Sequence, residues 1–302
     1  MLSPQRLLNG RPSFNCKHLQ IRHENLRIAV IEPLERALGI GSAKMIEQAN
    51  QMNELEDGND DIGHGAFSDL RKSRFLWYYE CYSLAIAEGE AEKNRKRKFE
   101  KMPFECPGNT MDGHFDYPEL RQRLEAVREA IMAETKAWSV EGRAAQEQET
   151  GIAANLVRQR EQIVEIYKAR SNFTVDLHLA DGNPFVWELT YFGRPMTQLD
   201  GGIFNFIIHL SPRFPEEQPR VFVQPPLFHY RVSNHGVLCY FPERPEEMQN
   251  HVDAIVAALE EEAPYDPRAT VNPEATRLFW GSPDDRKQYN RRLRRSVERS
   301  TE

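Results

Sequence analysis

The chain has 302 residues, of which 40% are hydrophobic and 28% are charged, so it can form and cover more than one globular core. Its net charge of −7 argues against a general nucleic-acid-binding protein, because such proteins need a basic surface. No apolar stretch reaches the roughly 20 residues that a membrane-spanning helix requires, so we expect no membrane-embedded segment.

The cysteines are few and far apart. Cys16, Cys81, Cys106 and Cys239 show no paired spacing, which is typical of proteins from a reducing compartment. Residues 1–10 lack the continuous apolar segment of a secretory signal. These features predict a cytoplasmic or nuclear protein, and the absence of paired Cys or His spacing predicts no metal site.

The first 150 residues carry mostly helical patterns. We expect helices at residues 26–38, 67–101 and 118–148, with an acidic, glycine-rich loop at residues 54–65. The pattern therefore predicts a helical N-terminal extension over residues 1–150, and it does not indicate what this extension does.

Two of the expected helices carry an apolar stripe, and we expect both stripes to be buried. The stripe of the helix at 67–101 consists of Leu70, Trp77, Cys81, Leu84 and Ala85. The stripe of the helix at 118–148 consists of Leu120, Leu124, Val127, Ile131 and Trp138.

The pattern changes after residue 150. A helix at 152–170 is followed by four short segments that are typical of strands, at 173–179, 185–191, 203–210 and 220–223. Three helical segments follow, at 247–262, 273–280 and 283–299. A helix, a four-stranded antiparallel meander and closing helices make an α+β domain whose sheet is covered on one face.

A series of motifs runs through this second half. It consists of Trp187-Glu188, then Gly201-Gly202 before a strand, then Phe214-Pro215 with Pro219 four residues later, and finally Cys239 at the end of a long loop. In this order and spacing the series resembles the catalytic core of ubiquitin-conjugating enzymes. The resemblance covers about residues 151–302 and implies the α+β fold of that family.

The resemblance implies that Cys239 carries ubiquitin, or a ubiquitin-like modifier, as a thioester. Sulfur suits this task, because a thiolate is a good nucleophile and its thioester is easily attacked. A single cysteine in an exposed, extended loop is what the chemistry requires. The partners implied are the modifier, an activating enzyme and a ubiquitin ligase, with no cofactor, no nucleic acid and no membrane.

One motif departs from the family. Where the family has His-Pro-Asn, this chain has His229-Tyr230-Arg231. The resemblance implies that His229 supports the loop by hydrogen bonding. The family's asparagine assists lysine transfer, in part through the negative oxygen that develops, and Arg231 or Asn234 could supply such a donor.

Other candidate site residues follow from the same resemblance. Asp266 precedes a proline after the next helix and is a candidate acidic gate to the site. Phe214 and Glu216 occupy positions at which ligases contact members of this family. That contact is normally apolar, and the charge of Glu216 argues against it here. Arg158 and Arg160 lie on the first helix of the domain, where activating enzymes and ligases dock.

Two alternatives remain open from the sequence. The altered tripeptide and the charge of Glu216 also fit a catalytically inactive scaffold that binds ubiquitin or another protein partner. In the other alternative, the N-terminal helices are the functional part, and the conjugating domain serves as a docking platform for them.

Overall fold

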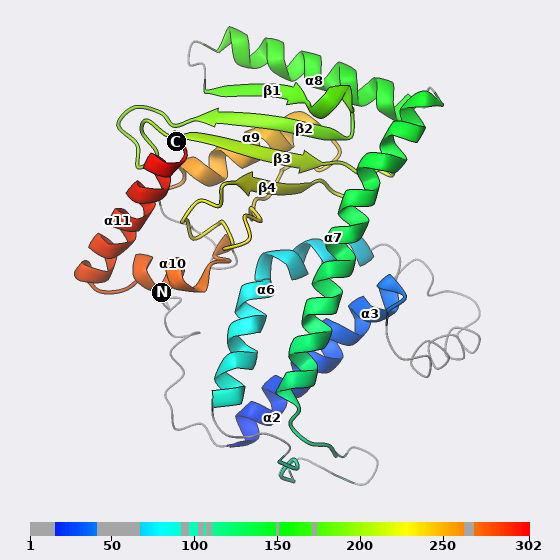
Figure 1. Cartoon of the computed structure of the whole chain (residues 1–302), viewed down its shortest axis with the longest axis vertical. Coiled ribbons are helices and arrows are strands. Elements are labelled where there is room, and N and C mark those ends of the chain that lie inside the picture. The colour runs from blue at the N-terminus through cyan, green and yellow to red at the C-terminus, as the bar shows by residue number, and fades with distance from the viewer. Residues whose placement is uncertain are drawn as a thin grey trace. The chain divides into compact units, whose positions relative to one another are not determined.

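The computed structural model describes residues 16–40, 67–91, 97–101, 106, 110, 112–148, 151–170, 174–262 and 269–302. The predicted loop at 54–65 and the predicted gate residue Asp266 lie outside this range. The chain forms two compact units, whose elements are labelled in Figure 1. The first combines Met1–Phe75 with Cys81–Ile131, and the second combines Leu76–Glu80 with Met132–Glu302.

The first described element of the first unit is a continuous helical run. It consists of α2 (Cys16–Glu24), the π-helix η1 (Asn25–Ile31) and α3 (Glu32–Leu38). The helix predicted at 26–38 is thus the second part of a longer run. Pro33 is the second residue of α3 and directly follows η1, so it lies inside the run and supplies no N–H to it.

Helix α6 (Ser68–Ala91) is shorter than the predicted helix at 67–101. Residues 97–101 are not helical: Lys98 forms an antiparallel bridge with His114, and the N–H of Phe99 donates to the Gly113 carbonyl at 3.0 Å. The predicted apolar stripe is also wrong in part, because Leu70 and Leu84 are exposed. The buried apolar side chains of α6 are Phe75, Leu76 and Ile86. Apolar residues occur on every side of α6, so its periodicity does not define one buried face, and tertiary contacts determine which residues are buried.

Helix α7 (Tyr117–Glu147) begins and ends within one residue of the prediction, and its predicted stripe is fully buried. Its second half, from Met132, belongs to the unit that contains the sheet. There, Glu134 accepts an ion-pair hydrogen bond at 2.7 Å from Arg220, whose guanidinium also stacks on Trp138 at 4.2 Å. The sheet unit therefore includes part of the region that the sequence assigned to the extension.

The second unit confirms the predicted α+β fold (Figure 1). Its antiparallel sheet has the order β1-β2-β3-β4. The elements are α8 (Gly151–Ala169), β1 (Val175–Leu179), the 3₁₀ turn η2 (Ala180–Gly182), β2 (Val186–Phe192), β3 (Ile203–His209), β4 (Arg220–Gln224), α9 (Met248–Glu260), α10 (Pro273–Phe279) and α11 (Pro283–Arg299).

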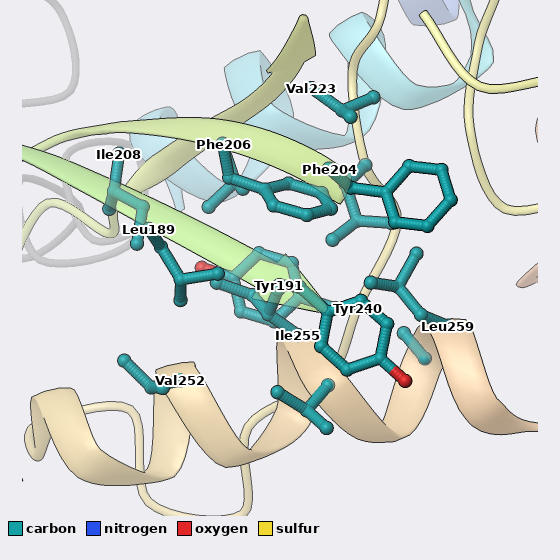
Figure 2. Close-up of a cluster of buried hydrophobic side chains, with 14 of the residues drawn as sticks. Leu189, Tyr191, Phe204, Phe206, Ile208, Val223, Tyr240, Val252, Ile255 and Leu259 are labelled. Carbon is teal, nitrogen blue, oxygen red and sulfur yellow. The ribbon is translucent and has the colours of Figure 1, made fainter. Parts of the chain in front are cut away.

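Alternate residues of the strands form the core against α9. Figure 2 shows the aromatic and aliphatic side chains of β2 and β3 next to those of α9. The buried side chains on the strands are Leu189, Tyr191, Phe204, Phe206 and Ile208, and those on the helix are Val252, Ile255 and Leu259. The intervening Glu188 and Asn205 are exposed. This period of two is what a sheet covered on one face requires.

Backbone conformation and close packing explain why glycines occupy both positions before β3. Gly201 has a φ of 77°, in the left-handed region that glycine adopts most easily. A Cβ on Gly202 would lie 2.5 Å from the Phe204 ring. Larger residues at either position would disturb the turn that aligns β3 with β2.

Candidate functional site

The loop of residues 229–241, called the cysteine loop below, pairs with the outer edge of β4. The N–H of Val223 donates to the Gly236 carbonyl at 2.8 Å, and the N–H of Leu238 donates to the Val221 carbonyl at 3.1 Å. Between these bonds, Phe222 and Val237 form an antiparallel bridge. This short pairing places Cys239 directly after a segment fixed to the sheet.

A tight turn precedes that pairing and requires glycine. The N–H of Gly236 donates to the Ser233 carbonyl at 2.9 Å, and the N–H of Ser233 donates to the Val237 carbonyl at 3.0 Å. Gly236 has a φ of 80°, and a Cβ there would lie 2.5 Å from the carbonyl oxygen of Val223. Both the conformation and the close approach to β4 therefore exclude a side chain.

Cys239 has no exposed surface, with a relative accessibility of 0%. Its N–H donates to the Arg231 carbonyl at 2.9 Å, so the two ends of the cysteine loop are joined beside the sulfur. The neighbouring Leu238 and Tyr240 are also buried. This differs from the exposed loop that the resemblance implied, because the cysteine loop packs inward on both sides of the sulfur.

A segment of α6, Leu76–Glu80, contacts the cysteine loop on both sides of Cys239. The Trp77 ring meets the Phe241 ring edge-on with centroids 5.4 Å apart. The Tyr79 ring lies 5.7 Å from that of His235. Trp77 was expected in a buried stripe, but its partner in the cysteine loop was not. Three consecutive aromatic residues at positions 77–79 cannot all face one side of a helix, so they indicate contacts on more than one side.

Asn234 is held by two elements. Its Nδ2 donates to the Glu80 carboxylate at 2.7 Å, and its backbone N–H also donates to that carboxylate. Its Oδ1 accepts from Nδ2 of Asn272 at 3.1 Å. Asn272 is the N-cap of α10, where its Oδ1 accepts from the N–H of Ala275 at 3.0 Å. The side chain of Asn234 is thus fixed on both its donor and its acceptor side.

His229 is buried within the cysteine loop. Its Nδ1 accepts from the N–H of Arg231 at 3.2 Å, so the neutral ring carries its proton on Nε2. Burial, and to a smaller extent the charge of Arg231, lowers the pKa of His229 to about 3. The ring is therefore neutral at physiological pH and acts on the backbone as a hydrogen-bond acceptor.

Arg231 is bound to a carboxylate and to the cysteine backbone. Its Nε donates to Glu261 at 2.8 Å, and its Nη1 lies 3.4 Å from the Cys239 carbonyl oxygen. The preceding Tyr230, where the family has proline, donates from its hydroxyl to the Glu261 carbonyl at 2.6 Å. The His229-Tyr230-Arg231 tripeptide thus ties the cysteine loop to the end of α9.

The other predicted site residues lie elsewhere. Arg160 donates from Nε and Nη2 to the Leu177 carbonyl of β1, at 3.1 and 2.9 Å, which fixes its guanidinium to the sheet. Arg158 and Glu216 are exposed, whereas Phe214 is buried. Phe214 shares the hydrophobic core with the cysteine loop, since its ring contacts His251, which is hydrogen-bonded to Tyr240.

Two further features bear on the kind of site. Within the parts of the chain that the structure describes, no three His, Cys, Asp or Glu side chains come together in a way that could hold a metal ion. None of the described helices combines the length and the apolar character needed to cross a bilayer.

The fold and the site define a class of protein: an α+β domain with an antiparallel meander, in which one long loop carries a cysteine beside the last strand. Comparison with known proteins gives the family. Residues 158–296 match the family model described as "Ubiquitin-conjugating enzyme". This part of the chain, just under half of its length, therefore carries a ubiquitin-conjugating enzyme domain, and a helical region precedes it.

Individual relatives are distant. The chain is 28% identical over 127 residues to ubiquitin-conjugating enzyme E2 3 of Arabidopsis thaliana, and 29% identical over 128 residues to ubiquitin-conjugating enzyme E2 2 of Aspergillus fumigatus. It is 28% identical over 137 residues to ubiquitin-conjugating enzyme E2 7 of Triticum aestivum. Each alignment covers 40% of this chain and 79% of the relative.

Proposed function

We propose that this chain conjugates ubiquitin or a ubiquitin-like modifier through Cys239. It receives the modifier from an activating enzyme and passes it to a ligase cysteine or a substrate amine, in the cytoplasm or nucleus. The observation that carries the proposal is the position of Cys239 within a family-type domain, directly after the segment that pairs with β4.

The proposed reaction consists of two consecutive acyl transfers. The Cys239 thiolate attacks the modifier's C-terminal carbonyl, held as a thioester on the activating enzyme; a new C–S bond forms, and the activating enzyme's thiol leaves with a proton. In the second step, an amine or thiol attacks the same carbonyl. The bond to Cys239 then breaks, and the sulfur regains a proton.

The burial of Cys239 adds a requirement to this mechanism. A modifier cannot reach a sulfur without exposed surface, so the cysteine loop must open before charging. Trp77 and Glu80 contact residues on either side of the sulfur, and these contacts are the ones whose loss would favour opening. Charging would then depend on a minor, open population of the domain.

The donors for lysine transfer are occupied in this closed arrangement. Arg231 is paired with Glu261, and the amide of Asn234 is held by Glu80 and Asn272. An oxyanion donor must be aimed at the developing charge, and neither group is shown in that role. Charging of Cys239 is therefore better supported than direct transfer to lysine.

The alternative is a catalytically inactive scaffold that uses the same fold to bind ubiquitin or another protein. Three observations favour it: the buried sulfur, the replaced tripeptide and the fixed side chain of Asn234. Both functions use the domain as a protein-binding module, and they differ in whether the sulfur ever carries the modifier.

A charging assay separates the two. The full chain is incubated with activating enzyme, modifier and ATP, and adducts are resolved with and without reducing agent. We expect an adduct that reducing agent removes and that Cys239→Ala abolishes. Cys106→Ala, which changes an exposed cysteine elsewhere, is the matched control and should keep the adduct.

An adduct that persists in Cys239→Ala would show that another group carries the modifier. Absence of any adduct with a panel of modifiers, under conditions in which Cys239 reacts with a small thiol reagent, would favour the scaffold. That reagent control distinguishes an inactive enzyme from a closed one.

A further inference from the structure

Helices α10 and α11 enclose a basic groove at the C-terminal end of the domain. Its volume is about 430 Å³, and it is lined by Glu274, Arg277, Gln288, Arg291, Arg292 and Arg295. Four arginines and one glutamate give this lining a net charge of +3 on a chain whose total is −7. We call it the arginine groove.

The arginines of the groove differ in how far their charge is compensated. Arg292 is paired with Glu274 and stacks over Phe228 at 4.1 Å. Arg277 lies 3.9 Å from a carboxylate oxygen of Asp285. Arg291 and Arg295 are exposed, and neither forms an ion pair with any carboxylate of the described residues.

The position of these two arginines costs the helix some stability. The face of α11 that packs on the core carries Tyr289, Leu293 and Val297. Arg291 and Arg295 therefore stand one turn apart on the exposed side, where like charges four residues apart repel by a few tenths of a kcal/mol. Solubility alone would be served equally well by alternating charges, so the concentration of one sign points to an anionic ligand.

The residue type and the size of the groove restrict that ligand. Arginine presents a planar fork of donors that matches carboxylates in pairs of hydrogen bonds. From Gln288 to Arg295 the helix rises about 10 Å, the length of roughly three residues of an extended chain. The groove thus fits a short run of carboxylates.

The ends of α11 argue against a long polyanion. Its first turn carries Asp284 and Asp285, and Glu298 lies in its last turn. A nucleic acid strand that followed the helix would meet these carboxylates at both ends, whereas a short acidic peptide lies between them.

We propose that the arginine groove binds a short acidic peptide segment of a partner protein. This surface lies outside the cysteine loop, so the proposal goes beyond conjugation through Cys239 and holds equally for an inactive scaffold. Arg291 and Arg295 are the residues that contact the peptide carboxylates.

Fluorescence anisotropy tests the proposal on the full chain. The probe is a fluorescein-labelled peptide of four consecutive glutamates between glycines, and its control carries glutamines instead. We expect saturable binding of the glutamate peptide that weakens as salt is raised. The double variant Arg291→Ala/Arg295→Ala should bind at least about tenfold more weakly, as expected from the loss of two charge-assisted contacts.

A second double variant serves as the matched control. Lys287→Ala/Arg299→Ala removes the same charge from exposed positions of the same helix outside the groove, and its affinity should change less than about threefold if only the general field is affected. Equal losses in the two variants, or no saturable binding of the glutamate peptide, would overturn the proposal. Tighter binding of a twelve-nucleotide oligothymidine, with displacement of the peptide, would overturn the assigned ligand class. Matching thermal unfolding of all three proteins shows that the variants are folded.

Discussion

The sheet and the cysteine loop are neighbours, but different interactions maintain them. The sheet owes its position to large apolar side chains, such as Tyr191, Phe206 and Ile208, that are buried against α9. The cysteine loop adds Leu238 and Tyr240 to the same core, but its path is fixed by backbone pairing with β4 and by a few polar side chains, chiefly Arg231 and Asn272. A region stabilised by many van der Waals contacts unfolds as one unit. A region whose path is fixed by a few hydrogen bonds can be altered by a single substitution.

The largest expected effect tests the sheet side of this comparison. Phe206→Ala removes a ring with about 1% exposure from the core and should lower the free energy of unfolding by about 3–5 kcal/mol. Phe192→Ala, on the exposed side of β2, should cost less than about 1 kcal/mol. Urea titration of both variants measures the difference, and similar costs would contradict a core on one face only.

The second prediction concerns the loss of stability at low pH that is caused by His229 of the cysteine loop. His229 has a pKa of about 3 in the folded chain, below the ordinary value of about 6.5 expected when unfolded. Below pH 6.5 the unfolded chain therefore binds a proton that the folded chain does not. The free energy of unfolding therefore has its full value above pH 6.5. It decreases as the pH falls toward 3, by up to about 1.4 kcal/mol per pH unit.

The measurement is the unfolding free energy between pH 7 and pH 5, compared with His229→Gln. His251, whose pKa burial lowers to about 4, contributes to both proteins, so the comparison isolates His229. The wild-type chain should lose about 2 kcal/mol more than the variant over this range. Equal slopes would mean that His229 takes up a proton without unfolding the loop.

The third prediction separates the two roles of Asn272. Asn272→Ala removes the N-cap of α10 and also the donors to Val232 and Asn234, and should cost about 2 kcal/mol. Asn272→Ser restores a cap acceptor but is too short to reach the loop, so it should recover about half of that loss. Thermal unfolding of the two variants checks this. Full recovery with serine would show that the contacts to the cysteine loop contribute nothing.

The smallest effect on stability is expected for substitutions in α6. Their effect is measured through the reactivity of Cys239. Trp77→Ala/Glu80→Ala removes an edge-on ring contact and a carboxylate acceptor, together about 1–2 kcal/mol. If these contacts keep the loop closed, alkylation of Cys239 by iodoacetamide should become roughly five- to thirtyfold faster. The other three cysteines are replaced by serine so that only Cys239 reports.

Glu88→Ala is the control for that experiment, because it removes a carboxylate from an exposed position of the same helix. The carboxylate of Glu88 pairs with Arg22 and not with the cysteine loop, and an exposed pair of this kind contributes about 0–1 kcal/mol. The alkylation rate of this variant should match that of the parent protein. Unchanged rates in the double variant would show that the cysteine loop opens independently of Leu76–Glu80.

Local patterns were enough to predict most of the sheet unit. Helix α11 has the predicted bounds, because Ser282 and Asp285 form a capping box directly before it and Pro283 fits its first turn. The strands β2 and β3 lie within one residue of their predicted limits, because alternation between buried and exposed residues continues to their ends. These signals reside within a few residues of sequence.

The closed state of the site could not be predicted in this way. Sequence order placed Cys239 in a loop after β4, but the loop is also held by contacts between residues far apart in the chain, such as Glu80 with Asn234. Asn272 joins two functions, helix cap and loop anchor, of which only the first has a local signal. The partner-binding roles predicted for Arg158, Phe214 and Glu216, and the catalytic role of Cys239, stay predictions.

The pairing between the cysteine loop and β4 has a consequence for solubility. Because Gly236 and Leu238 occupy its outer edge, β4 does not present a row of open N–H and carbonyl groups to other molecules. A movement large enough to release Cys239 would uncover that edge, which could then pair with a strand of a second chain. Conditions that uncover this edge while they speed the reaction of the sulfur should therefore also promote aggregation.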